Sequence, residues 1–404
     1  DADGFHSLFN GKDLAGWVPV NVHPGTFSVK DGMIVSTGKP TGVMRSDRMY
    51  ENFVIEIEWK HLTPGGNSGL FIWGDGVTAP GTPFARGVEV QILDEAYIDQ
   101  HPTIRGKATG QGDVFPIHGA TMVPDRPHPS KGSMRCLPSE NRTRPAGEWN
   151  HYRVVCNDGV IKLSVNGKEV SGGSKCNPRK GYVCLESEGA PIHFRNLRIK
   201  ELPSTNAPPE QTAKTDPNYT FLYNGIDLAG WDAKDPGHKG HWVPKDWTLD
   251  YDGKSAAADK TLWTEKAYGD FEMVVDWRLT GKPKAGGDAG RTGIRLRGTD
   301  KAEVALWCDP AGSGGVPGYD AAPKAKADRK PGDWNRTILT MRGDRLTVTL
   351  NGQMVLENAR LSGVPATGRI GLADHGDPVQ FASVFVKELP PAGDAKAAGT
   401  GARP

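Results

Sequence analysis

The segment Phe9-Asn10-Gly11-Lys12-Asp13-Leu14-Ala15-Gly16-Trp17 recurs in the second half of the chain as Tyr223-Asn224-Gly225-Ile226-Asp227-Leu228-Ala229-Gly230-Trp231. Further segments repeat in the same order: Glu51–Trp59 as Gly269–Trp277, Glu148–Asn150 as Asp333–Asn335, and Lys200–Pro203 as Lys387–Pro390. Self-similarity over so long a period indicates two copies of one domain. We predict a first copy at 1–203, a linker at 204–216, a second copy at 217–391 and a disordered tail at 392–404.

Composition narrows the classes of partner. The 404 residues carry a net charge of +1, with acidic and basic side chains interspersed, so the chain lacks the field that nucleic acids or anionic membranes require. No apolar run approaches the roughly 18 residues of a membrane span. The start Asp1-Ala2-Asp3 resembles one exposed by removal of a leader, so we expect a periplasmic or extracellular protein. The five cysteines leave disulfides and simple burial both open.

Short alternating runs predict an all-β fold. Apolar residues alternate with charged ones from Phe53 to Lys60, which is the pattern of a strand with one wet face, and the same pattern returns from Phe271 to Arg278. Two alternating runs end in Asn166-Gly167 and Asn351-Gly352, a dipeptide that favours two-residue hairpins. Antiparallel sheets follow, and a two-sheet sandwich for each copy is the simplest architecture.

Alternation also assigns side chains to faces in the first copy. In the run Val88–Asp94 the valines and Ile92 point to the core, so Glu89 and Gln91 share the opposite face, about 7 Å apart. The run Ser68–Trp73 likewise predicts Phe71 and Trp73 on the polar face, where aromatic rings beside carboxylates and amides suit a sugar. The alternative is that both rings pack beneath a long loop.

The second copy replaces most of these residues. Arg295 and Arg297 stand where Phe71 and Trp73 stood, Glu303 is kept, and Trp307 replaces Leu93. These residues form either a site for a polar or anionic ligand or a solvated face of ion pairs. His375 follows Asp374 near the end of the copy, and imidazole titrates near neutral pH.

A long segment from Tyr97 to Arg144 has no counterpart of comparable length in the second copy. Loops of this size over a sheet usually shape a site. It carries His101, His118 and His128, of which His118 is the candidate for acid chemistry, although all three also fit plain loop positions.

The motifs together resemble the 3-keto-disaccharide hydrolase domain family. They are the opening L-F-N-G-K-D-L-x-G-W, the N-S-G strand, G-x-E-V-Q-I-L-D, E-W-N before an N-G hairpin, and the closing F-R-N-x-x-I-K-E-L. The resemblance spans nearly all of the first copy and, more loosely, the second. It implies two tandem concanavalin-like jelly-roll β-sandwiches, export from a bacterial cell, and cleavage of glycosides oxidised to a ketone at C3.

Neither copy carries the family pattern in full. Family members tend to have arginine at the position of Trp73 and L-Q-x-H-G where this chain has Leu185–Gly189, which contains Glu186 and Glu188. The second copy keeps Arg297, Glu303 and His375 and loses other positions. Three possibilities follow: the first copy is active, both copies only bind, or a site forms where the copies meet. We expect the copies to contact one another.

Our sequence-based hypothesis is cleavage of a 3-keto-glycoside by the first copy. We assign Glu89 as the base and Asp94 or His118 as the acid. The substrate-binding residues are Asn67, Phe71, Trp73, Gln91, Glu186, Glu188 and Arg195, with Arg195 as stabiliser of the enolate, and the second-copy set is Arg297, Glu303, Trp307 and His375. No cofactor is predicted, although a divalent metal held by Glu89, Asp94 and a loop histidine is an alternative. The rival function is a non-catalytic carbohydrate-binding protein, because the same fold serves lectins.

Overall fold

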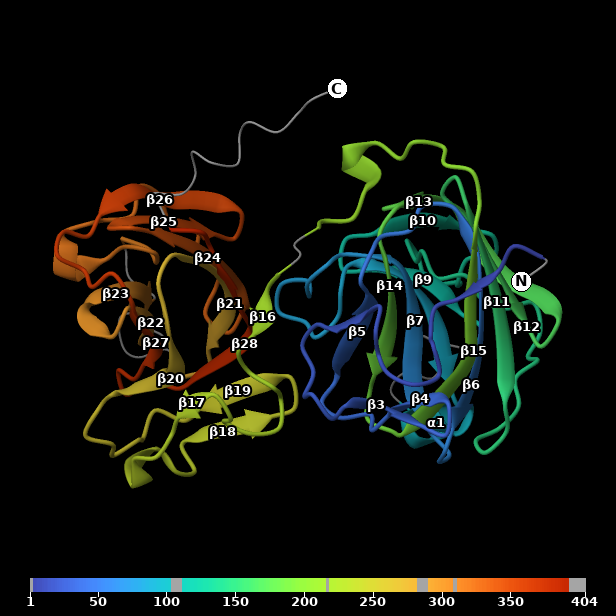
Figure 1. Cartoon of the computed structure of the whole chain (residues 1–404), viewed down its shortest axis with the longest axis horizontal. Coiled ribbons are helices and arrows are strands. Elements are labelled where there is room, and N and C mark those ends of the chain that lie inside the picture. Colours follow the sequence, from blue (N-terminus) through green and yellow to red (C-terminus); the bar gives the residue numbers. More distant parts are fainter. Residues whose placement is uncertain (1–2, 103–110, 216–217, 282–289, 308–310, 392–404) are drawn as a thin grey trace. The chain divides into compact units, whose positions relative to one another are not determined.

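The computed structural model describes residues 3–102, 111–215, 218–281, 290–307 and 311–391. The chain divides into two compact units, Asp1–Ala79 with Pro83–Pro217 and Pro80–Thr82 with Asn218–Pro404. The first unit contains the first copy apart from Pro80–Thr82, and the second unit contains the second copy. The predicted tail at 392–404 lies outside the described residues. Figure 1 labels the elements of both copies.

The first copy consists of two antiparallel sheets. Its larger sheet runs, in spatial order, β10 (Thr121–Pro124), β13 (Lys168–Asn177), β12 (Val160–Val165), β11 (Asn150–Asn157), β6 (Phe53–His61), β15 (Ile192–Glu201), β4 (Met33–Ser36) and β3 (Phe27–Lys30), with β1 (His6–Ser7) paired to β15. Its smaller sheet runs β2 (Trp17–Pro19), β5 (Gly42–Ser46), β14 (Tyr182–Ser187), β7 (Asn67–Gly74), β8 (Gly87–Leu93) and β9 (Val114–Ile117). One helical turn, α1 (Ala96–Gln100), follows β8.

The second copy repeats this order. Its larger sheet runs β18 (Trp242–Lys245), β19 (Thr248–Tyr251), β28 (Val379–Glu388), β21 (Phe271–Leu279), β24 (Asn335–Arg342), β25 (Arg345–Leu350) and β26 (Gln353–Arg360), with β16 (Thr220–Phe221) paired to β28. Its smaller sheet runs β17 (Trp231–Asp232), β20 (Thr261–Tyr268), β27 (Gly368–Ala373), β22 (Arg291–Leu296) and β23 (Thr299–Trp307). Short 3-10 helices occupy Pro236–His238 and Pro317–Tyr319 of this copy, and another, Pro209–Gln211, lies in the segment predicted as the linker. The matching order confirms two tandem jelly-roll β-sandwiches.

Each core fills the space between the two sheets of its copy. In the first copy Phe53, Ile55, Ile57 and Trp59 of β6 pack with Leu70 of β7 and with the apolar residues of β8. The second copy has its own cluster, to which Phe271, Met273, Val275 and Trp277 contribute in the same way. Burial of these side chains, at about 25 cal/mol per Å² of apolar surface, is the main force that holds each sandwich closed.

Turn chemistry follows the prediction. Asn166 and Gly167 join β12 to β13 with φ of 46° and 88°, and Asn351 and Gly352 join β25 to β26 with φ of 50° and 85°. Positive φ at both residues is the geometry of the tight hairpin turn that Asn-Gly favours.

The four cysteines that the structure describes, Cys136, Cys156, Cys176 and Cys184, are free and buried. They pack as small apolar side chains, and burial raises the pKa of Cys176 and Cys184 to about 12. Cys308 lies outside the described residues.

Candidate active site

The polar face of the small sheet in the first copy gathers three glutamates. Val88, Val90 and Ile92 of β8 belong to the core, so Glu89 and Gln91 lie on the opposite face, as the alternation predicts. Strand β7 lies between β8 and β14, so Glu186 of β14 lies on the other side of β7 from Glu89. Glu188 follows two residues after Glu186. Loops cover this face, since Glu89 and Gln91 are only 7% and 6% exposed.

Gly69 creates the space in which two of these carboxylates meet. A Cβ atom at this position would lie 2.9 Å from Oε2 of Glu186 and 3.1 Å from Oε1 of Glu89. Glycine in a strand interior often marks such a close approach. Both carboxylates therefore lie beside the same point of β7, with Gln91 directly opposite it on β8.

Burial changes the protonation of the two glutamates. Removal from water, together with the charge of Glu188, raises the pKa of Glu89 to about 8. Burial also raises the pKa of Glu186 far above its usual range, and the charges of Glu188 and Glu89 add to the effect. Oε2 of Glu186 is buried and has no hydrogen-bond partner among the residues that the structure describes. Such pairs of carboxyl groups hold protons at neutral pH and are typical of acid and base chemistry.

Glu188 is held by an amide network. The side-chain nitrogen of Asn67 donates to Glu188 Oε2 at 2.6 Å, and Gln91 donates to Oδ1 of Asn67 at 2.9 Å. Asn67 and Gln91 thus orient a carboxylate, which is the positioning role that the sequence suggested for them.

Two further groups at the site come from the long segment. Tyr97 of α1 lies near Asn67 and Glu188, and burial raises the pKa of its phenol, so the hydroxyl remains a donor. Arg135 pairs with the buried Asp113 at 2.7 Å and stacks on Phe115, the residue opposite Glu89 on β9. The sequence analysis did not identify either residue. The length of the segment indicated that it helps to form a site, but nothing in the sequence indicated which of its residues reach the glutamates.

Trp73 is a correction to the prediction. It has a φ of 56° beside a register shift between β7 and β14, and this bulge turns its side chain into the core. The ring is fully buried and its indole nitrogen donates to the carbonyl of Glu51. Phe71 keeps the predicted face but is fully covered, with Phe84 against it at 5.9 Å, so neither ring is an exposed sugar platform.

Asp94 and Arg195 are also corrections. Asp94 accepts backbone N–H groups from Gly65, Ala96 and Ala146, so its carboxylate organises loops and is not an available acid. Arg195 lies on β15 of the larger sheet, on the far side of the core from Glu89, where it pairs with Glu58 at 2.6 Å. His118 is exposed after β9 and stacks on Phe84, so it lies near the edge of the covered face.

The structure gives the positions of the residues named for the metal alternative. Among the residues that the structure describes, no group of three His, Cys, Asp or Glu side chains is arranged to hold a metal ion. The predicted ligand Asp94 has both oxygens engaged by backbone N–H groups. Asp94 thus holds loops in place in this structure, and the divalent metal stays a prediction.

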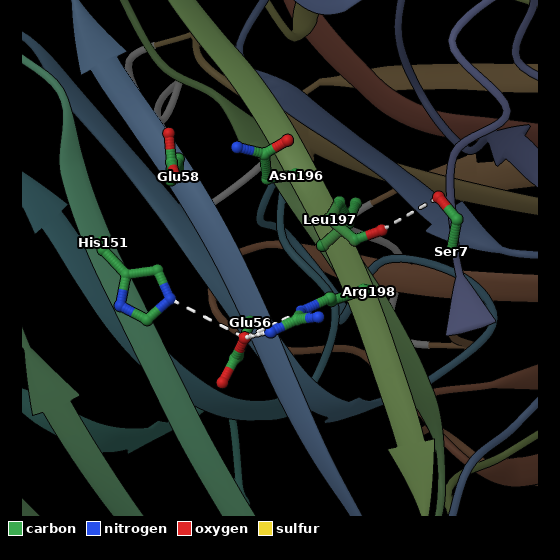
Figure 2. A pocket seen from close by; sticks show the side chains of 7 residues that line it. All are labelled: Ser7, Glu56, Glu58, His151, Asn196, Leu197 and Arg198. Atoms are coloured by element: carbon green, nitrogen blue, oxygen red, sulfur yellow. Dashed lines mark hydrogen bonds and ion pairs between the residues drawn. The ribbon is translucent and has the colours of Figure 1, made fainter. Parts of the chain in front are cut away.

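A polar hollow of about 390 Å³ lies on the outer face of the larger sheet of the first copy. Figure 2 shows its lining residues, Ser7, Glu56, Glu58, His151, Asn196, Leu197 and Arg198. Glu56 bonds to Arg153 and Arg198, and although burial opposes the change, these bonds lower its pKa. The carboxylates here are ionised and paired, unlike those beside Gly69.

Comparison with known proteins identifies the family. The model of the 3-keto-alpha-glucoside-1,2-lyase-like domain matches residues 4–200 and 218–387, which is most of the chain. The chain belongs to this family. A Bacteroides thetaiotaomicron protein named 3-keto-disaccharide hydrolase is 24% identical over 250 residues, covering 50% of this chain and 80% of the relative.

Two solved structures match about half of the chain at low identity. A Parabacteroides distasonis protein assigned as a glycosyl hydrolase is 23% identical, with a TM-score of 0.36 over 50% of this chain and 95% of that one. The carbohydrate-binding module CBM66 of Bacillus subtilis is 13% identical, with a TM-score of 0.32 over 46% and 96%. Across the described residues, no helix is long and apolar enough to cross a membrane.

The second copy of the family domain has a different set of groups on the equivalent face. His375 Nε2 lies 2.6 Å from Oε1 of Glu303, and Nε of Arg295 lies 2.8 Å from Oε2. Although burial opposes the change, the bonds from His375 and Arg295 lower the pKa of Glu303. This carboxylate is therefore ionised, whereas its counterpart Glu89 is not.

Arg297 is a correction in the second copy. It has a φ of 52°, turns inward, and donates to the carbonyls of Gly269, Gly343 and Pro365 and to Asp270. Gly269 is the counterpart of Glu51, so Arg297 and Trp73 bond the same carbonyl of the fold. The arginine absent from the first copy is therefore a structural residue, and its loss removes nothing from the polar face.

Proposed function

We propose that the first copy cleaves glycosides whose sugar carries a ketone at C3, with the glutamates beside Gly69 as its acid and base groups. Membership of the family and the name of the Bacteroides relative support this substrate class. The observation that carries the proposal is the meeting of the buried Glu89 and Glu186 beside Gly69, with the half-buried Glu188 next to them and with Oε2 of Glu186 lacking a hydrogen-bond partner among the described residues.

The chemistry needs an acid and a base close together. A ketone at C3 acidifies the proton on C2, so a base can remove that proton to give an enolate. The enolate expels the oxygen on C1, the C1–O bond breaks, and the departing alkoxide takes a proton from an acid. Water can then add to C1 of the resulting double bond, with return of a proton to C2, and the sum of the two steps is hydrolysis.

The protonation of each glutamate suggests its role. Glu188, hydrogen-bonded by Asn67, is the better candidate for the base that accepts the C2 proton. Glu89 is protonated at neutral pH because its pKa is about 8, so it fits the acid that protonates the leaving oxygen. This reverses the role we gave Glu89 from the sequence. Glu186 is a proton-holding neighbour, and Arg135 and Tyr97 are donors for the enolate oxygen.

The test compares turnover of a 3-keto-glucoside by the wild type and by Glu89→Gln, Glu186→Gln and Glu188→Gln, each of which keeps the side-chain shape. We expect each variant to lose at least a hundredfold in kcat, which is the usual contribution of general acid or base groups. Glu58→Gln, on the outer face, is the matched control and should retain turnover. Full activity of all three variants would contradict the proposal.

Two further outcomes have defined meanings. Binding of the 3-keto-glucoside without product would favour the non-catalytic carbohydrate-binding alternative. Loss of turnover in Glu303→Gln but not in Glu89→Gln would move the reaction to the second copy.

The substrate class also suggests a location, and we extend the proposal to the periplasm or the outside of the cell. Cell fractionation with an antibody to the chain tests this, and recovery in the cytoplasmic fraction alone would contradict it.

A further inference from the structure

The polar face of the smaller sheet in the first copy has an aromatic wall. A Cβ atom on Gly69 would lie 3.1 Å from Oε1 of Glu89 and 3.1 Å from Cε1 of Phe71, so the Phe71 ring lies beside the acid groups. The ring of Phe84 packs on Phe71 with 5.9 Å between the ring centroids. Phe84 belongs to residues 75–86, which connect β7 to β8 and form the wall loop. The position of this loop therefore sets one boundary of the space around Glu89.

Hydrogen bonds close the base of the wall loop. The backbone N–H of Asp75 donates to the carbonyl of Arg86 at 2.9 Å. The guanidinium of Arg86 donates to both carboxylate oxygens of Asp75, each at 3.1 Å. Nearer its tip, the N–H of Ala79 donates to the carbonyl of Phe84 at 2.8 Å. The place of the Phe84 ring thus depends on how the base of the loop is held at Asp75.

The segment 203–215, which includes most of the predicted linker, is bonded to the first copy along its length. The carboxylate of Glu51 accepts from the backbone N–H of Ala207 at 3.0 Å. The N–H of Ala213 donates to the carbonyl of Lys180 at 2.7 Å, and the Ala213 side chain is buried. The path of the chain is therefore fixed by the first copy for about ten residues after its last strand.

The end of this segment bonds the base of the wall loop. The backbone N–H of Lys214 donates to Oδ1 of Asp75 at 2.8 Å, and the carbonyl of Lys214 accepts from the N–H of Gly76 at 2.9 Å. The carbonyl of Gly76 accepts in turn from the buried guanidinium of Arg45 at 3.2 Å. Asp75 is only 8% exposed, so the donors from Arg86 and Lys214 replace bonds that its carboxylate loses to water.

Both bonds at Lys214 come from its backbone, and its side chain is exposed. The contact is therefore independent of the side chain at this position, provided that the residue keeps its N–H group. Proline lacks that group. Lys214→Pro removes the bond to Asp75, and Lys214→Ala keeps it, so the two variants form a matched pair.

We propose that the segment 203–215 belongs to the functional unit of the first copy, in which it holds the wall loop in place beside the acid groups. Asp75 and Lys214 are then positioning residues, which act through the aromatic rings of the wall. The effect on catalysis rests on the proposed function of the glutamates, whereas the hold on the loop does not. The family model matches residues 4–200 in this copy, so the segment lies outside the part of the chain that the family defines.

The test compares Lys214→Pro with Lys214→Ala in the full chain by native-state hydrogen exchange. Peptides from the wall loop should exchange about tenfold faster in Lys214→Pro than in the wild type, because one hydrogen bond at the base of the loop is lost. Lys214→Ala should exchange at the wild-type rate. Peptides from β6 and β15 should be unchanged in both variants, which separates local release of the loop from unfolding of the first copy.

Turnover of a 3-keto-glucoside, measured on the same samples, reports the effect on the site. The value of kcat/KM should fall about tenfold in Lys214→Pro, because a displaced wall positions the substrate less well. It should remain at the wild-type value in Lys214→Ala.

Three results would overturn the inference: the wall loop exchanges equally in Lys214→Pro and the wild type, Lys214→Ala releases the loop as much as Lys214→Pro does, or a released loop leaves kcat/KM unchanged. A wild type that binds the 3-keto-glucoside without forming product would count against the proposed function alone. The affinity of the two variants for this sugar would then replace kcat/KM, and equal affinities would overturn the inference.

Discussion

The buried Glu89 predicts an unusual pH dependence of stability in the first copy. Its pKa is raised by burial to about 8, from an ordinary 4.5, so the folded state binds a proton that the unfolded state releases as the pH rises above 4.5. Stability is therefore lost as the pH rises from about 5 to about 8, and the loss levels off above that. At 1.36 kcal/mol for each tenfold change, the loss between pH 5 and pH 9 is about 4 kcal/mol.

Replacement of Glu89 by glutamine removes this loss. At pH 5 the wild-type side chain is already mostly neutral, so Glu89→Gln should change the free energy of unfolding by less than about 1 kcal/mol. At pH 9 the variant should be more stable than the wild type by about 4 kcal/mol. Native-state hydrogen exchange of peptides from β7 and β8, followed across a urea series, reads the first copy separately from the second.

The control has a different pH dependence. Although burial opposes the change, hydrogen bonds from Asn196 and Arg195 lower the pKa of Glu58, so this carboxylate is ionised at both pH values. Glu58→Gln should therefore change the free energy of unfolding by the same amount at pH 5 and at pH 9. A Glu89→Gln variant whose stability relative to wild type is equal at the two pH values would refute the reasoning.

Three further outcomes follow from the same geometry. Gly69→Ala should lower kcat/KM for a 3-keto-glucoside at least tenfold, because its Cβ would lie 2.9 Å and 3.1 Å from the carboxylates of Glu186 and Glu89. An unchanged kcat/KM would show that the two carboxylates need not meet beside residue 69. The pH profile of kcat/KM should fall as the pH rises through about 8, where Glu89 loses its proton, and a profile that rises there would exclude Glu89 as the acid. Trp73→Ala should destabilise the first copy by about 3–5 kcal/mol in thermal unfolding, and a loss below 1 kcal/mol would contradict its place in the core.

The sequence was sufficient for the fold and for part of the site. Strict alternation in β8 identified the faces of Glu89 and Gln91 because every residue of that strand keeps regular extended geometry. The repeat predicted two copies because whole segments recur in order, and the Asn-Gly pairs predicted the hairpins.

The errors have physical causes that a strand pattern does not record. A single residue with positive φ reverses the alternation, which is why Trp73 and Arg297 turned out to face inward. Arg195 was assigned to the site from its motif, but strand pairing puts β15 in the other sheet. Tyr97 and Arg135 belong to the long segment between β8 and β11, whose course depends on tertiary contacts rather than on local periodicity.

The inward turn shared by Trp73 and Arg297 has a consequence for how relatives are compared. Both side chains fasten the end of a strand in the smaller sheet to the carbonyl just before the central strand of the larger one, at Glu51 or Gly269. An indole and a guanidinium each donate an N–H group to this carbonyl, and the guanidinium of Arg297 also bonds Gly343, Pro365 and Asp270. The exchange of arginine for tryptophan between the two copies of this chain therefore concerns how each pair of sheets is tied together, away from the polar face.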